Sequence, residues 1–252
     1  MILYKYITVE KADEWLIGEN SILLTPPVYL NDLLEFRVRR EPADMTERRA
    51  MFVKFQREKP TSLQFEEFDR SITRREYVDR EPEDMRRMLS DTYGVVSLTR
   101  DPLNELMWAH YGLNKGVAIG YRSDWANEHN GIKVSSLPIG MAMELQYTNE
   151  IIAMKKDFSD AARHLTTKRE CWAYEREWRI IQELSEAREV QRDQKTFFAI
   201  PAKRDQIAHV VFGANAEAAF IERVKRWLGD TTACLQKVMI NHESHELEFS
   251  DI

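Results

Sequence analysis

The stretch of this chain with the highest density of reactive side chains is W-A-Y-E-R-E-W-R-I-I, residues 172–181. If it is a β-strand, its side chains alternate between two faces, and Glu175, Glu177 and Arg179 stand side by side on one face. Neighbouring carboxylates raise each other's pKa, and a nearby guanidinium lowers it. We therefore interpret this face as a candidate catalytic site with Glu177 and Glu175 as its reacting carboxylates.

Two structural alternatives explain the same residues without chemistry. The face could be a strand edge in contact with water, where charges cost little. If residue 175 lies in a helix, Glu175 and Arg179 simply form an i,i+4 pair. Aromatic and β-branched residues favour a strand from about Trp178 onward, so Glu175 lies at a predicted junction between helix and strand.

A second candidate is the segment W-A-H-Y, residues 108–111. On a helix, Trp108 and Tyr111 share a face. Three roles are open for His110: a packing residue, a hydrogen-bond partner of a substrate, or a general base. No G-x-S-x-G or paired Cys-His motif occurs, and the two cysteines lack metal-ligand spacing. We therefore predict no serine or cysteine nucleophile and no metal site.

Composition limits the class of protein. The 252 residues are 43% hydrophobic and 31% charged, which is typical of an ordinary soluble protein, and we predict a single α+β domain over residues 1–252. A net charge of −6 argues against a protein that mainly coats nucleic acid. The chain has no apolar run long enough to cross a bilayer, and its first residues lack signal-peptide features. We expect a cytoplasmic protein with no membrane partner.

Strand and helix patterns alternate along most of the chain. Strands are predicted at 2–7, 21–25, 93–99, 116–121, 143–147, 172–181, 197–201, 208–213 and 235–240, and helices at 9–17, 104–111, within 150–171 and at 216–228. Helices around a mixed or antiparallel sheet define the α+β fold class.

Residues 37–92 differ in character, because they are dense in interleaved charges and contain four Arg-Arg pairs. This pattern predicts a helical insertion of two or three amphipathic helices separated near Pro60 and Pro82. Mixed charges usually mark a solvated helix face. The alternative is a docking arm whose arginines contact phosphates or a partner protein.

Three segments together resemble a bacterial family of unknown function. Residues 26–36 (P-P-V-Y-L-N-D-L-L-E-F), 107–121 (M-W-A-H-Y-G-L-N-K-G-V-A-I-G-Y) and 171–181 (C-W-A-Y-E-R-E-W-R-I-I) correspond in order to its F-N-D-P-F-E-like, W-x-H-Y and W-x-Y-E-x-E-x-R elements. With the N-terminal L-Y-K-Y, the resemblance covers nearly the whole chain. It departs at Leu33 and Leu34, where the family has Pro-Phe.

The order of a first strand L-Y-K-Y, a second strand S-I-L-L-T and a later E-x-E strand is also distantly similar to the ADP-ribosyltransferases. That similarity implies a split β-core, NAD as substrate, Glu177 as the catalytic glutamate and Glu175 as the acid that orients a nucleophile. The nucleotide-binding residues would then be Tyr4, Lys5, Tyr6, Thr25, Trp108, His110, Tyr111 and Arg179. Lys5 departs from the Arg or His of that superfamily, and L-L-T-P-P departs from its Ser-Thr-Ser.

These observations define three functional hypotheses. The first is an enzyme that cleaves the nicotinamide–ribose bond of NAD and transfers ADP-ribose to water or to a protein or nucleic-acid acceptor. The second is a non-enzymatic protein- or nucleic-acid-interaction module, a sensor of a bacterial stress or defence system. The third is a metal-dependent nuclease with Glu175, Glu177 and His110 around Mg²⁺.

Overall fold

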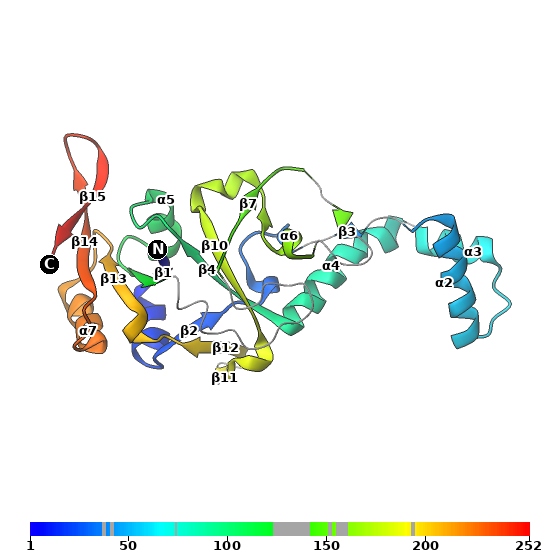
Figure 1. Ribbon diagram of the computed structural model, residues 1–252, viewed down its shortest axis with the longest axis horizontal. Coiled ribbons are helices and arrows are strands. Elements are labelled where there is room, and N and C mark those ends of the chain that lie inside the picture. Colours follow the sequence, from blue (N-terminus) through cyan, green and yellow to red (C-terminus); the bar gives the residue numbers. More distant parts are fainter. Residues whose placement is uncertain are drawn as a thin grey trace.

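The computed structural model describes residues 1–36, 39–40, 43–73, 75–122, 142–150, 153–154, 161–192 and 195–252. The predicted α+β fold class is confirmed, because helices collect around a mixed, curled sheet (Figure 1). The strand order of this large sheet is β15-β14-β13-β5-β1-β4-β10-β6. Its strands are β1 (Ile2–Ile7), β4 (Tyr93–Thr99), β5 (Val117–Arg122), β6 (Met143–Glu144), β10 (Glu177–Glu183), β13 (Ile207–Phe212), β14 (Cys234–Asn241) and β15 (Glu246–Asp251).

The large sheet is divided between β1 and β4. β1 pairs with β5 along its whole length, from Ile2 to Ile7, and β4 pairs with β10 from Tyr93 to Thr99. Between β1 and β4, however, the only register pair is Tyr4 with Thr99. The two halves of the sheet therefore meet at one point and separate on either side of it.

A smaller sheet lies against this division. It has the order β11-β12-β2 and consists of β2 (Ser21–Leu24), β11 (Arg188–Arg192) and β12 (Lys195–Pro201). An isolated bridge between Thr25 and Val95 joins the end of β2 to β4. Two short parallel pairs complete the described strands: β3 (Arg39–Arg40) with β8 (Ala153–Met154), and β7 (Gln146–Tyr147) with β9 (Thr167–Lys168).

The helices are short except in the charged segment and near the C-terminus. They are α1 (Val9–Lys11) with a π-helical continuation (Ala12–Ile17), α2 (Met45–Glu58), α3 (Phe65–Thr73), α4 (Arg75–Thr92), α5 (Glu105–Met107) with a π-helical continuation (Trp108–Gly112), α6 (Ala161–Leu165) and α7 (Ala218–Leu228). Short 3₁₀ segments cover Pro27–Tyr29, Glu170–Glu175, Leu184–Glu186 and Arg204–Gln206. Thr8 caps α1 through a hydrogen bond from the Lys11 N–H to Thr8 Oγ1 (3.4 Å).

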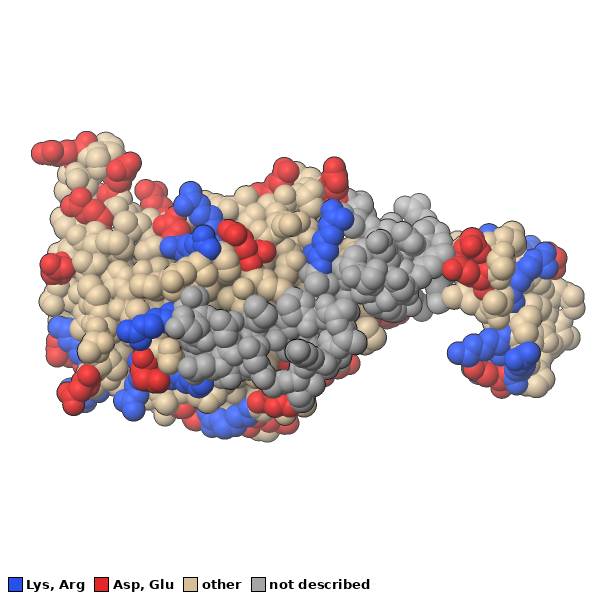
Figure 2. Space-filling model, in the orientation of Figure 1, with Lys and Arg blue, Asp and Glu red and all other residues tan. Residues whose placement is uncertain are grey.

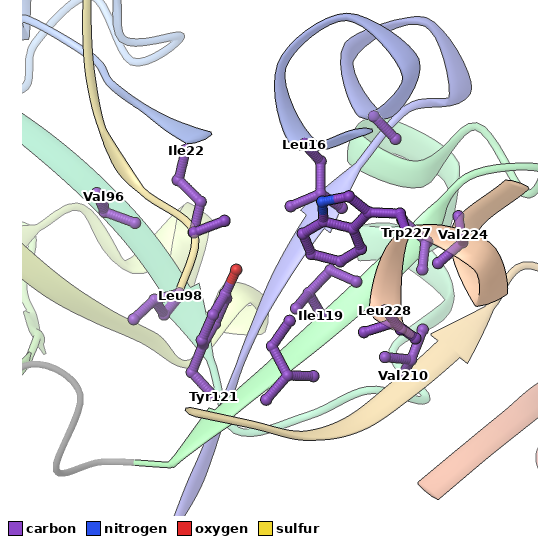
Figure 3. Close-up of a cluster of buried hydrophobic side chains, with 14 of the residues drawn as sticks. Leu16, Ile22, Val96, Leu98, Ile119, Tyr121, Val210, Val224, Trp227 and Leu228 are labelled. Carbon is purple, nitrogen blue, oxygen red and sulfur yellow. The ribbon is translucent and has the colours of Figure 1, made fainter. Parts of the chain in front are cut away.

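The main core fills the space between the two sheets and α7. Figure 3 shows side chains from distant elements converging there, including Leu16, Ile22 and Leu98. Trp227 of α7 closes one side of this core, and its ring N–H donates to Asn20 Oδ1 (3.2 Å). Burial of apolar side chains from β1, β2, β4 and α7 together stabilises the arrangement in which the sheet divides.

The charged segment forms a projecting structure that we call the helical arm, made of α2 and α3. Both helices stand away from the sheets at the far end of α4 (Figure 1). Rings of Phe52, Phe55 and Phe68 pack together inside the arm, with centroid separations of 5.3 Å from Phe68 to each of the others. On its visible face, basic and acidic side chains are interspersed (Figure 2).

Several predictions of secondary structure are wrong, including the single strand at 143–147, which the structure divides into β6 and β7. Pro82 does not separate two helices but lies inside α4, where packing of buried residues such as Met85 outweighs the lost hydrogen bond. Within the described part of 150–171, only Ala161–Leu165 is α-helical, and β9 and a 3₁₀ turn follow it. The strand β15 was missed because its sequence, E-L-E-F-S-D, is mostly polar and lies at the sheet edge.

Candidate functional site

The E-x-E motif lies at a turn, so the prediction of one continuous strand from 172 to 181 is wrong. Glu175 ends the 3₁₀ turn, Arg176 has a left-handed backbone (φ 44°), and Glu177 is the first residue of β10. The alternative of a junction at residue 175 is therefore the one that the structure adopts. Both carboxylates nevertheless point to the same place, because each accepts a hydrogen bond from the ammonium of Lys168.

Five ionisable side chains form what we call the carboxylate cluster: Glu35, Lys168, Glu175, Glu177 and Arg179. The Lys168 Nζ lies 2.5 Å from Glu175 Oε2, 2.9 Å from Glu177 Oε2 and 3.8 Å from Glu35 Oε2. Arg179 donates through Nε and Nη2 to Glu177 Oε1 (3.1 and 2.9 Å) and through Nη2 to Glu35. No side chain of the cluster is more than 4% exposed. With all five side chains ionised, three carboxylates and two cations give the cluster one net negative charge, and uptake of a proton by one carboxylate removes it.

A tyrosine and an asparagine extend the cluster toward the surface. The Tyr111 hydroxyl donates to Glu175 Oε1 (2.6 Å), and Asn31 Nδ2 donates to the Tyr111 oxygen (2.5 Å). Tyr111 belongs to the π-helical turn after α5, and the Asn104 side chain caps that helix by accepting from the Met107 N–H (3.1 Å).

The surroundings move the pKa values of the two E-x-E carboxylates in opposite directions. Burial opposes ionisation of Glu177, but Arg179 and Lys168 outweigh it and lower its pKa to about 2. For Glu175, burial dominates over the attraction of Lys168, so its pKa is raised. Glu35 also has a raised pKa because burial outweighs the effect of Arg179. One carboxylate of the motif is thus held ionised while its neighbour is able to take up a proton.

A cavity of about 330 Å³ opens beside the cluster, where β1 and β4 separate. Its wall includes eight of the predicted site residues: Tyr4, Lys5, Tyr6, Thr25, His110, Tyr111, Glu175 and Glu177. Lys168 and Asn31 line the same cavity. Its volume lies at the small end of the range of ligand sites.

Lys5 adds a positive charge to the β1 side of this cavity. Its Nζ donates to the carbonyl oxygen of Ser97 on β4 (3.2 Å). Burial, reinforced by the nearby Lys11, lowers the pKa of Lys5 to about 8, although Glu177 and Glu175 act in the opposite direction. The cavity therefore has a basic side at β1 and an acidic side at the E-x-E turn.

Two of the predicted nucleotide-binding residues do not reach the cavity. Trp108 is 1% exposed, and its ring N–H donates to the Pro102 carbonyl (2.9 Å) while its ring packs edge-on against Tyr6. Arg179 is fully buried behind Glu177. Its geometry therefore suits a contact that keeps Glu177 ionised rather than the predicted contact with the nucleotide.

Tyr4 and Tyr6 have their hydroxyl groups bonded to other parts of the protein, whereas His110 lies at the surface. The Tyr4 hydroxyl bonds His209 Nδ1 (2.9 Å), and the Tyr6 hydroxyl donates to the Asp101 carbonyl (2.8 Å). His110 is exposed, so it is not a packing histidine, and its ring lies 6.3 Å from that of Tyr174 at the cavity mouth.

Sequence reasoning missed Asn31, Glu35 and Lys168. The first two lie in the N-D-L-L-E segment that resembles the first family element. The acid at the end of this segment, Glu35, could have been predicted as a site residue from that resemblance. Lys168 lies seven residues before Glu175 in the chain, with no motif around it, and only the fold brings it between the carboxylates.

The geometry also bears on metal binding. The ammonium of Lys168 lies where a divalent cation would have to meet Glu175 and Glu177. Within the described ranges, no three His, Cys, Asp or Glu side chains are grouped so that they could hold a metal ion. The same ranges contain no helix that is long and apolar enough to cross a membrane.

The fold and the site define an α+β protein with a buried carboxylate cluster beside a cavity in a divided sheet. Residues 107–180 match the model of a family described as "Protein of unknown function (DUF2971)". The matched stretch includes the second family element and most of the third, with Tyr111, Lys168, Glu175 and Glu177, and supports the resemblance to a family of unknown function. Neither the curated proteins nor the solved structures contain a match to the chain.

Proposed function

We propose that the protein binds NAD with its nicotinamide–ribose half in the cavity between β1 and β4, and that it cleaves the bond between the nicotinamide and the ribose. The observation that carries this proposal is the pair Glu177 and Glu175, whose pKa values are shifted in opposite directions at the cavity wall. Cleavage of a glycosidic bond uses one carboxylate that stays ionised and a second that exchanges a proton. The opposite pKa shifts of Glu177 and Glu175 suit them to these two roles.

Glu177 is the residue that stabilises the transition state. As the bond from the ribose C1′ to the nicotinamide nitrogen breaks, its electron pair goes to nitrogen, and neutral nicotinamide leaves. Positive charge develops on the ribose, and a preorganised carboxylate beside it lowers the barrier. Arg179 and Lys168 keep Glu177 ionised and immobile, so it needs no reorganisation during the reaction.

Glu175 is the proton acceptor in the second half of the reaction. A hydroxyl of the acceptor, or water, forms a bond to C1′, and its proton passes to Glu175. The raised pKa of Glu175 suits this role because it brings the carboxylate closer to the working pH. Its oxygens already accept from Tyr111 and Lys168, and each retains a second lone pair for the incoming hydroxyl.

Lys5 and Tyr111 are the proposed contacts for the rest of the ligand. Lys5 uses one of its three donors on Ser97 and retains two for ribose hydroxyls or a phosphate. Tyr111 lines the cavity, whereas the nearby aromatic residues Trp108, Tyr174 and Trp178 do not, so Tyr111 is the one of these four that could stack on a ligand ring. A protein or nucleic-acid acceptor would approach from the mouth near His110.

Nicotinamide release from NAD tests this proposal. The wild type is expected to release nicotinamide. Glu177→Gln should lose at least about 100-fold in rate, because the developing charge is no longer stabilised. The control Glu170→Gln, which changes an exposed glutamate of the same segment, should behave as the wild type. Absence of turnover under all acceptor conditions, together with no NAD-induced rise in the unfolding temperature, would contradict it.

A further inference from the structure

The pair Arg86-Arg87, one of the four arginine pairs of the charged segment, is divided by the fold. Both residues lie on α4, but Arg86 is 3% exposed while the side chain of Arg87 is 70% exposed. A fully buried arginine is costly unless its donors are satisfied. The partners of Arg86 therefore show what it does.

Arg86 binds the main chain of what we call the site loop, residues 27–36. Its Nε and Nη2 donate to the Pro27 carbonyl (3.2 and 2.9 Å), Nη1 to that of Leu33 (3.0 Å) and Nη2 also to that of Asp32 (3.3 Å). One turn further along α4, Ser90 Oγ accepts from the Val28 N–H (2.9 Å). One side of α4 thus fixes the path of the loop from both ends.

The site loop delivers two side chains to the carboxylate cluster. Asn31 donates to Tyr111, which in turn donates to Glu175. Glu35 pairs with Arg179, which binds Glu177. Between these two residues, Asp32 Oδ1 accepts from the Leu34 N–H (2.9 Å) and shapes the turn. Each E-x-E carboxylate is therefore connected to the loop through one intermediate side chain.

The same helix carries the helical arm. α4 begins beside α3 and runs into the body, where it ends at the start of β4 (Figure 1). Because Arg86 lies on the part of α4 that packs on the body, a shift or rotation of the helix moves the site loop with it. Packed elements with hydrogen bonds between them transmit such displacements.

We propose that Arg86 is a positioning residue, which holds the site loop so that Asn31 and Glu35 meet Tyr111 and Arg179. Through α4 it links the helical arm to the carboxylate cluster. Its effect on turnover rests on the proposed function, whereas its effect on the loop and on the cluster does not.

The first test compares Arg86→Met and Arg86→Lys with the matched control Arg87→Met. Lysine keeps the charge but cannot bridge several carbonyls as the guanidinium does. Both Arg86 variants are expected to show faster amide hydrogen exchange in residues 27–36 and also in 108–112 and 175–179, with Arg87→Met unchanged. Nicotinamide release by the Arg86 variants should fall on the order of 100-fold, because small displacements of reacting groups have effects of this size.

The second test distinguishes positioning from a general loss of stability. If Arg86 acts through the loop, Arg86→Met should shift the pH profile of turnover in the same direction as Glu35→Gln and at least as far, because it also releases Asn31. The double variant should change less than the sum of the two single variants. If the wild type releases no nicotinamide, the titration of the Glu175 and Glu177 carboxyls, followed by NMR, provides the same comparison.

Any of three outcomes would overturn the proposal. The first is unchanged hydrogen exchange in residues 108–112 and 175–179 in both Arg86 variants, and the second is that the effects of Arg86→Met and Glu35→Gln simply add. The third is that Arg86→Met does not alter the titration of the Glu175 and Glu177 carboxyls. If Arg86→Met fails to fold, Ser90→Ala replaces it, because this change removes the bond from the Val28 N–H and, besides it, only the local bond from Ser90 Oγ to the Arg86 carbonyl one turn back in α4. It should raise exchange in the same three segments, and no change in any of them would count against the proposal.

Discussion

Glu175 and Glu177 belong to different structural elements, a 3₁₀ turn and a strand, yet share the ammonium of Lys168 at 2.5 and 2.9 Å. The left-handed residue Arg176 between them marks the turn at which the 3₁₀ segment ends and the strand begins. Although burial alone lowers the pKa of Lys168, the three carboxylates around it outweigh burial and raise it. Lys168 is therefore charged at all physiological pH values.

Removal of this ammonium should destabilise the protein strongly. Lys168→Met leaves three neighbouring carboxylates without their shared ammonium, and breaking a buried ion pair costs about 3–5 kcal/mol. Chemical denaturation of Lys168→Met against Lys203→Met, a control outside the cluster, measures this loss. Addition of Glu175→Gln should recover part of it, because only one carboxylate then remains beside Glu177. No recovery in the double variant would show that Lys168 acts independently of the pair.

Lys5 should report the charge on the opposite wall of the cavity. We expect it to titrate near pH 8, as measured by NMR of ¹³C-methylated lysines, with its signal assigned from Lys5→Arg. Glu177 raises the pKa of Lys5, so Glu177→Gln should shift the titration to lower pH. Glu170→Gln should leave it unchanged. A Lys5 titration that is insensitive to Glu177 would mean that the two walls do not interact.

Tyr111→Phe should raise the pKa of Glu175. The Tyr111 hydroxyl donates to the ionised form of this carboxylate and lowers its pKa, so its loss favours the protonated form. The pH range in which Glu175 accepts a proton should move upward, which the pH dependence of nicotinamide release or the carboxyl NMR titration measures. The stability cost is about 1–3 kcal/mol, typical of one lost hydrogen bond to a charged group. An unchanged titration would contradict the role of Tyr111.

The contribution of Glu177 to the stability of the protein should be lost in acidic solution. Its folded-state pKa, about 2, is below the ordinary value of 4.5, so its contribution is present above pH 4.5 and is lost as the pH falls toward 2. Glu177→Gln should be less stable than the wild type by about 3 kcal/mol at pH 7. This difference should shrink below pH 4.5. Denaturation curves at several pH values measure it, and a constant difference would contradict the assigned pKa.

Much of the secondary structure follows from local patterns. Alternating or continuous apolar runs predict β1, β4 and β5 because side-chain direction in a strand depends only on neighbouring residues. The same logic predicted helices in the charged segment, but it misplaced their boundary at Pro82, where burial of α4 against the body decides. It also extended the strand of the E-x-E motif back to Trp172, because alternation does not reveal a left-handed residue at Arg176.

The sequence by itself determined the chemical types at the site: two acids and an arginine in W-A-Y-E-R-E-W-R, a tyrosine in W-A-H-Y and a lysine in the first strand. Only the tertiary structure decided which of them meet. Glu35 and Arg179, separated by 144 positions, become partners, Lys168 enters between the glutamates, and Trp108 is turned into the core. Periodicity is a local property of the chain, whereas these contacts depend on where β1 and β4 separate and on the loop that Arg86 fixes.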